Sequence, residues 1–317
     1  MKRGMLLSFY ANAPLQVFGM TLGGAEAEQL AKALNVVGAY GLVVMFTLLS
    51  RQFGRRAVYV LAAAMAGLLG LFAATIHTPE AWTVWAFYFF GDLFNTIMLA
   101  AFWAFANDVI QPDEARRLYG PIGLGGVVGG FVGATVVRTL VESWGRAPLL
   151  ALCIGAMACI AGVAYVVNRR SDPAEDDSLT SNEAPTYTVI FDGMRRTARS
   201  PYLLAILSLV GLYEVVSNVV DFQLATLVEA HVQGGAARDA FFGLIGQVTG
   251  VLSIAVQVGL TGWVMKRFGI GVALLVLPVS LLIGSIGFVA VPGLGIAAAL
   301  SVSDNALNYS INQSAKE

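Results

Sequence analysis

The chain has 317 residues, of which 57% are hydrophobic and only 12% are charged, and its mean hydropathy is +0.73. A soluble domain carries about 25% charged residues, so this composition leaves too few charges to cover a water-exposed surface. The formal net charge of −1 offers no general attraction for nucleic acid, and we expect no nucleic-acid partner. Composition therefore excludes an ordinary soluble enzyme and favours an integral membrane protein.

Nine stretches are long and apolar enough to cross a lipid bilayer as helices, since a spanning helix needs roughly 20 mostly apolar residues. Helices are expected because the backbone of a single segment in lipid must satisfy its own hydrogen bonds. The predicted fold class is an all-α, polytopic membrane helix bundle of about nine spanning helices. In chain order the stretches are 28–50, 57–76, 81–108, 119–141, 148–168, 202–228, 240–264, 270–292 and 294–315. A weaker apolar stretch over 5–21, interrupted by Asn12 and Pro14, predicts a partial span.

Basic residues gather in every second connection between these stretches, which predicts the orientation of the chain. The connections 77–80 and 292–293 contain no Lys or Arg. By the positive-inside rule the basic connections face the cytoplasm, so we predict a multi-pass protein of the cell inner (plasma) membrane. The basic residues are Arg51, Arg55, Arg56, Arg116, Arg117, Arg169, Arg170, Arg195, Arg196, Arg199, Lys266 and Arg267.

The longest polar segment, residues 169–200, is rich in Pro, Ser and acidic residues and predicts a flexible cytoplasmic linker. It separates an N-terminal helical half, 1–168, from a C-terminal half, 201–317. A faint repeat relates SRQFGRRAVYVL (50–61) to MKRFGIGVALLV (265–276), as in the parallel repeats of major facilitator transporters. Such halves have six spans each, so we expect a fragment in which the first span and the last two are missing.

Polar side chains inside apolar helices are costly and are therefore candidates for function. Within two of the stretches they recur every three or four residues, so each set shares one helix face. We expect these faces to line an aqueous cavity; the alternative is that they join helices by hydrogen bonds. The candidates are Asp92, Asn95, Glu214, Asn218, Asp221, Asp304, Asn308 and Asn312.

Two lysines are candidates for binding an anionic substrate, which requires basic groups. Lys32 lies in the first turns of its span, and Lys316 lies near the end of the sequence. The alternative for an isolated Lys32 is that it extends to the membrane interface.

The glycine run GPIGLGGVVGGFVGA (120–134) lacks the ending of a phosphate-binding loop. Because its glycines recur every four residues, it predicts close packing of two helices.

One motif resembles a known family. FWAFANDVIQPDEARRLYGPIGLGG (102–126) is similar to the fourth and fifth spans of the bacterial and plastid-type ATP/ADP translocases, and GAEAEQLAK (24–32) and SINQSAKE (310–317) resemble two further family segments. The glycine-rich fifth span departs from the family's Gly-Ala-Asn signature. The resemblance implies that Lys32 and Lys316 contact nucleotide phosphates. It also implies that Glu114 and Glu214 are charged residues needed for transport.

We therefore predict a secondary transporter that exchanges ATP for ADP, or a related phosphorylated small molecule, by alternating access. Asn308 and Asn312 are expected to line the substrate site. No enzymatic activity, cofactor or metal is expected. One alternative is a proton-coupled facilitator of another solute that uses Asp92, Asp221, Asp304 or Glu214, and another is a truncated remnant that does not transport.

Overall fold

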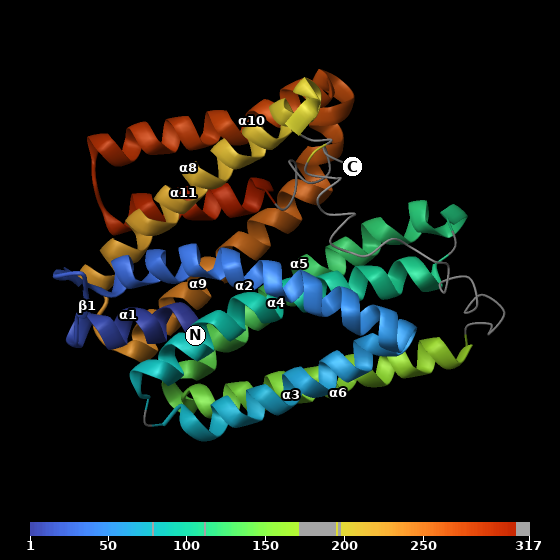
Figure 1. Cartoon of the computed structure of the whole chain (residues 1–317). Coiled ribbons are helices and arrows are strands. Elements are labelled where there is room, and N and C mark those ends of the chain that lie inside the picture. Colours follow the sequence, from blue (N-terminus) through green and yellow to red (C-terminus); the bar gives the residue numbers. More distant parts are fainter. Residues whose placement is uncertain (78, 111, 171–194, 196–197, 309–317) are drawn as a thin grey trace. The chain divides into compact units, whose positions relative to one another are not determined.

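The computed structural model describes residues 1–317 except 78, 111, 171–194, 196–197 and 309–317 (Figure 1). Each of the nine predicted stretches is helical over most of its described residues, which confirms the all-α membrane bundle. The helices are α1 (Lys2–Asn12), α2 (Gly24–Phe53), α3 (Ala57–Thr75), α4 (Ala81–Val109), α5 (Pro112–Trp144), α6 (Arg146–Arg170), α8 (Pro201–His231), α9 (Gly235–Ala255), α10 (Gly262–Ala290) and α11 (Leu294–Leu307). A short 3₁₀ turn, Gly54–Arg56, precedes α3, and a π-helical turn, Val256–Thr261, joins α9 to α10.

Six described helical segments are long and apolar enough to cross a membrane. The described apolar parts of α10 and α11 are shorter, Leu275–Ala290 and Leu294–Leu307. The length and composition of the helices therefore agree with a multi-pass membrane protein. The six segments are Gly24–Ser50, Ala57–Thr75, Ala81–Val109, Leu118–Trp144, Arg146–Arg169 and Gly235–Gly259.

The weak stretch over 5–21 divides into a helix and a hairpin. Pro14 disfavours helical geometry in the residue before it, and Ala13 ends α1 with φ −137° and ψ 82°. Strands β1 (Leu15–Val17) and β2 (Met20–Leu22) then pair in antiparallel fashion, with Val17 opposite Met20. Phe18 and Gly19 both have positive φ, as a tight two-residue hairpin turn requires. At 11 residues, α1 is too short to span a bilayer.

The described residues pack into two compact units. Unit 1 contains Met1–Gln29, Arg116–Gly145 and Tyr213–Glu317, and unit 2 contains Leu30–Ala115 and Arg146–Leu212. Helices α2, α5 and α8 contribute to both units. The predicted division at the linker 169–200 stays a prediction, because most of that segment lies outside the described residues.

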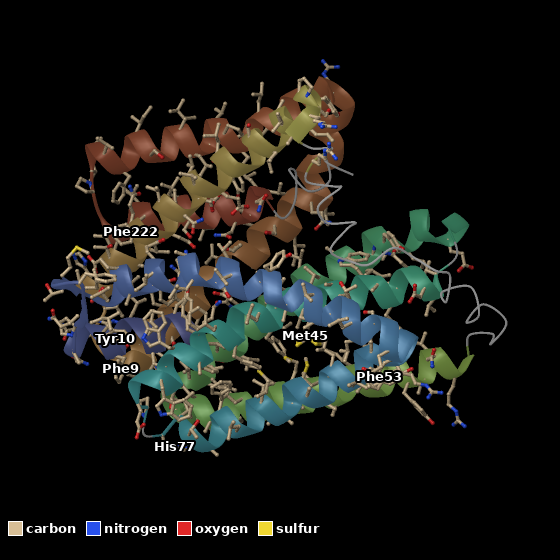
Figure 2. All side chains as sticks on the ribbon, in the orientation of Figure 1. Phe9, Tyr10, Met45, Phe53, His77 and Phe222 are labelled. Atoms are coloured by element: carbon tan, nitrogen blue, oxygen red, sulfur yellow. The ribbon has the colours of Figure 1, made fainter. Side chains whose placement is uncertain are left out.

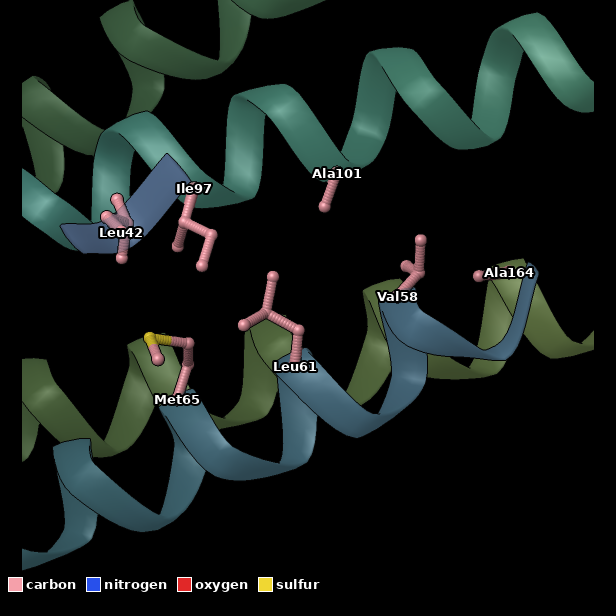
Figure 3. Packing of buried hydrophobic residues seen from close by; sticks show 7 residues of the cluster. All are labelled: Leu42, Val58, Leu61, Met65, Ile97, Ala101 and Ala164. Atoms are coloured by element: carbon pink, nitrogen blue, oxygen red, sulfur yellow. The ribbon is translucent and has the colours of Figure 1, made fainter. Parts of the chain in front are cut away.

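Unit 2 is held together by apolar side chains of α2, α3, α4 and α6. Leu61 and Met65 of α3 point toward Ile97 of α4, and Val58 lies beside Ala101 and Ala164 (Figure 3). Helix α3 also packs along α6. Since lipid tails are as apolar as these side chains, the gain here is close van der Waals packing rather than removal from water.

In unit 1, α9 contacts α1 and α11, and α10 contacts α11. Helices α5 and α9 cross closely at three glycines of α9. A Cβ built on Gly243 would lie 2.8 Å from the backbone N of Arg138, and one on Gly250 would lie 2.8 Å from Cβ of Phe131. Gly246 faces Ala134. The prediction that the glycine run of α5 packs closely against another helix is thus wrong for the described residues: α5 and α9 do approach closely, but through glycines of α9. No described atom lies within 4 Å of a Cβ built on Gly125, Gly129 or Gly133.

Candidate functional site

Asp304 is a carboxylate held inside unit 1 by two hydroxyl groups. Tyr213 Oη donates to its Oδ1 at 2.9 Å, and Ser217 Oγ donates to its Oδ2 at 2.6 Å. Asp304 lies on α11 and is 2% exposed, while the two donors are one turn apart on α8. Hydrogen bonds to an ionised acceptor are stronger than neutral ones, so this group fastens α8 to α11. A buried carboxylate with neutral donors is also a group that can accept a proton.

Asp221 pairs with a residue that the sequence did not single out, Arg3 of α1. Arg3 Nη1 lies 3.6 Å from Asp221 Oδ1, and Arg3 Nη2 donates to the Asp221 carbonyl at 3.4 Å. Arg3 Nε lies 2.6 Å from Oε1 of Glu28, whose side chain is only 1% exposed. The guanidinium also stands over the ring of Phe242, 4.6 Å from its centroid. One arginine thus joins four helices: α1, α2, α8 and α9.

Of the other members of the predicted stripe on α8, Asn218 lines a shallow depression and Glu214 does not. Glu214 and Asn218 are exposed, and Asn218 Nδ2 donates to the Glu214 carbonyl at 2.9 Å. Gln29 Nε2 donates to the Asn218 carbonyl at 3.4 Å. The depression has a volume of about 380 Å³, and its lining residues are Gln29, Val215, Asn218, Val219 and Phe222. Phe222 is labelled in Figure 2. The structure therefore directs Asn218 and Asp221 to different neighbours.

Three predicted site residues lie in unit 2, on three helices. Lys32 is half-buried in α2, and Asp92 is half-buried in α4, where its carbonyl accepts a hydrogen bond from Thr96 Oγ1 at 3.1 Å. Glu114 is exposed in the first turn of α5. Their convergence on one substrate site stays a prediction.

The end of the predicted site is described only in part. Asn308 follows α11, is half-buried, and directs its backbone N–H toward the carbonyls of Asp304 and Asn305. Asn312 and Lys316 lie outside the described residues.

Two arginines of unit 1 make structural contacts. Arg138 of α5 donates to the side-chain oxygen of Gln247 on α9. Arg238 is buried and donates from Nε to the Val232 carbonyl and from Nη2 to the Glu229 carbonyl, both at 2.9 Å. Because the last carbonyls of a helix lack intrahelical partners, Arg238 satisfies the end of α8 with a positive charge.

Glu229 satisfies the opposite kind of helix end. Its Oε1 accepts from the backbone N–H of Gly24 at 2.8 Å, and its Oε2 accepts from Ala25 at 2.7 Å. These are first-turn amides of α2, which have no carbonyl partner within their own helix. A carboxylate suits the positive end of the helix dipole. Glu229 therefore attaches the end of α8 to the beginning of α2.

Sequence reasoning missed Arg3, Glu28, Tyr213, Ser217 and Glu229. Some signals were present: Arg3 opens an apolar stretch, and Tyr213 and Ser217 lie four residues apart beside Glu214. Nothing in the sequence joins them to their partners, which lie on other helices. For a metal site, the described residues contain no cluster of three or more His, Cys, Asp and Glu side chains.

Several apolar helices of spanning length, with polar side chains bonded to one another between them, define a multi-pass membrane protein. Residues 61–306 match the family described as TLC ATP/ADP transporter. The match covers most of the sequence, and the chain belongs to this family, as its resemblance to the ATP/ADP translocases predicted.

Relatives with similar sequences carry related names. The chain is 30% identical over 240 residues to ADP,ATP carrier protein 1 of Chlamydia muridarum, covering 70% of this chain and 45% of the relative. It is 24% identical over 230 residues to the chloroplastic ADP,ATP carrier protein 1 of Arabidopsis thaliana, covering 68% of this chain and 36% of the relative. The chain thus spans less than half the length of these relatives. No solved structure shows significant similarity to the chain.

Proposed function

We propose that the protein is a membrane carrier that exchanges ATP for ADP by alternating access. The observation that carries the proposal is the family match over residues 61–306, together with relatives named ADP,ATP carrier protein. The carrier binds and moves its substrate without changing it chemically, so it is not an enzyme. It lies in the cell inner (plasma) membrane with the linker 169–200 on the cytoplasmic side.

In this proposal basic side chains hold the phosphates. Lys32 and Lys316 contact them as point charges, and Asn308 and Asn312 line the same site. Glu114 and Glu214, with Asp92, balance the charge of the cavity while it changes its access. The resemblance of GAEAEQLAK (24–32) to a segment of the family supports the assignment, and Lys32 is half-buried on α2.

The test is exchange of labelled ATP in liposomes that contain the protein and are preloaded with ADP. Lys32→Ala is expected to reduce exchange at least tenfold, because a charge-assisted phosphate contact is lost. Lys32→Arg, which keeps the charge, and Lys2→Ala, which removes a lysine of α1, are the controls. Equal exchange by Lys32→Ala and Lys2→Ala would exclude the proposed role of Lys32.

The buried Asp304 favours one second candidate, a proton-coupled facilitator of another small solute. Its two carboxylate oxygens accept hydrogen bonds from Tyr213 and Ser217, and in this candidate one of these oxygens takes up the coupled proton. Coupling through Asp221, Asp92 or Glu214 belongs to the same alternative. Solute uptake that requires a pH gradient, ignores nucleotides and is lost in Asp304→Asn would support this candidate over nucleotide exchange.

A further inference from the structure

Two polar connections in unit 1 join residues that precede the linker 169–200 in the sequence to residues that follow it. The first is the Glu229 carboxylate on the amides of Gly24 and Ala25, which are 205 and 204 residues away in sequence. The second is the Arg3 guanidinium between Glu28 and Asp221. In each connection the beginning of the chain, α1 or α2, is bonded to α8.

The glycines that open α2 make the first connection possible. A Cβ on Gly23 would lie 3.1 Å from Oε1 of Glu229, and one on Gly24 would lie 2.6 Å from the Leu7 carbonyl oxygen. Side chains at these positions would separate α2 from Glu229 and from α1. The Gly-Gly pair therefore leaves room for the carboxylate to reach the backbone amides of Gly24 and Ala25.

The two connections lie at different depths along α8. Asp221 and Glu229 are eight residues apart, which corresponds to roughly 12 Å along a helix. The first residues of α2 and the last residues of α8 are both predicted on the outer side of the membrane. The connections thus join the same helices at the predicted outer end and about two turns deeper.

Both connections are polar and can be reversed. A carboxylate that leaves backbone amides or a guanidinium exchanges those partners for water. The apolar contact beside them, of Leu7 with Ala25 and Ala225, is small and has to separate as well. Alternating access requires contacts between the two halves of a carrier to break and re-form on one side in every cycle. Polar contacts beside a small apolar contact are suited to this role, because water can replace the polar partners when they separate.

We propose that Arg3, Gly24, Glu28, Asp221 and Glu229 form an outer latch that opens and closes once in each transport cycle. The proposal rests on the proposed carrier function for its role in transport. The latch residues are positioning residues: they hold α2, which carries Lys32 one turn after Glu28, against α8. Opening breaks the bonds of Glu229 to α2 and of Arg3 to its carboxylates, and closing restores them.

Cross-linking beside the latch tests its opening. Gln29 Nε2 lies 3.4 Å from the Asn218 carbonyl, so cysteines at these two positions lie close together only while the latch is closed. The chain used also carries Cys153→Ala and Cys159→Ala, which remove both native thiols. In liposomes, a short reducible thiol cross-linker between Gln29→Cys and Asn218→Cys is expected to stop nucleotide exchange, and reduction is expected to restore it. Cross-linked protein that exchanges as fast as the reduced form overturns the proposal.

A second measurement needs no transport. In the same double-cysteine chain, Glu229→Gln and Arg3→Gln are each expected to slow cross-linking about tenfold, since one charge-assisted contact is lost from the closed state. Glu142→Gln is the matched control, because Glu142 is exposed near the outer end of α5. Size-exclusion profiles identify variants that fold. Folded Glu229→Gln and Arg3→Gln chains that cross-link as fast as the control overturn the latch. Latch-dependent cross-linking without nucleotide exchange supports the latch and removes only the proposed function.

Discussion

Arg3 Nε lies 2.6 Å from Oε1 of Glu28, although the two residues belong to different helices and the glutamate is almost fully buried. Removing the charge of one partner leaves the other in a medium that solvates it poorly. Replacing one partner of the pair is therefore expected to lower the stability of the protein more than replacing both.

Arg3→Met is expected to destabilise the protein by about 3 kcal/mol, because the buried Glu28 carboxyl group loses the guanidinium that pairs with it. The double substitution Arg3→Met with Glu28→Met is expected to recover much of this loss, since no unpaired carboxylate remains at the Glu28 position. Thermal unfolding in detergent, with Arg199→Met as an exposed control, measures the three variants. A double variant less stable than Arg3→Met would contradict this account of the pair.

Gly24→Ala is expected to lower stability by about 1–3 kcal/mol, as overpacking does elsewhere. The added Cβ would lie 2.7 Å from the Leu7 Cα, and backbone atoms cannot move aside cheaply. Gly41→Ala, on the same helix, is the control, because no described atom lies within 4 Å of its Cβ. In a helix interior that change is expected to be neutral or stabilising by up to about 1 kcal/mol. Equal unfolding temperatures for the two variants would show that α1 and α2 do not approach this closely.

The crossing of α5 and α9 gives a similar comparison between two glycines that look alike in sequence. Gly243→Ala places a Cβ 3.0 Å from the Arg138 Cα and is expected to cost about 1–3 kcal/mol. Gly129→Ala, in the conspicuous glycine run, is expected to be tolerated, because no described atom lies within 4 Å of its Cβ. The measurement is the unfolding temperature of each variant. If Gly129→Ala lowered the unfolding temperature more than Gly243→Ala, the tight contact would lie at the glycine run of α5 and not at Gly243, which would contradict this account.

The sequence predicted correctly those features that depend on a single helix and not on its neighbours. Hydropathy predicted spans at 57–76 and 81–108, and the structure has helices at Ala57–Thr75 and Ala81–Val109. Such segments are set by their own length and apolarity, since only a helix satisfies a lone backbone segment in lipid. The same reasoning overestimated 5–21 as a partial span, because a hairpin can also satisfy the backbone after Pro14.

The candidate site was less predictable because its bonds are between helices. Spacing indicated that Glu214, Asn218 and Asp221 share a face, but not that Asp221 meets Arg3 from the beginning of the chain. The pairing of Gly24 with Glu229 depends on the packing of α1, α2 and α8 together. A helical period determines which residues point the same way and leaves open which helix lies opposite.

The Asp304 group offers a last test on α8. Ser217→Ala removes the 2.6 Å hydrogen bond to Oδ2 of a buried carboxylate and is expected to cost about 1.5–3 kcal/mol of stability. Thr226→Ala is the matched control: Thr226 is exposed on the same helix, and its Oγ1 donates only to the Phe222 carbonyl among the bonds that the structure describes. That change is expected to stay within about 0.5 kcal/mol. Unfolding temperatures in detergent compare the two, and Tyr213→Phe, which removes the other donor, is expected to resemble Ser217→Ala. If Ser217→Ala and Tyr213→Phe both unfold at the temperature of Thr226→Ala, the hydroxyl groups do not hold Asp304, and α11 is fastened to α8 by apolar packing alone.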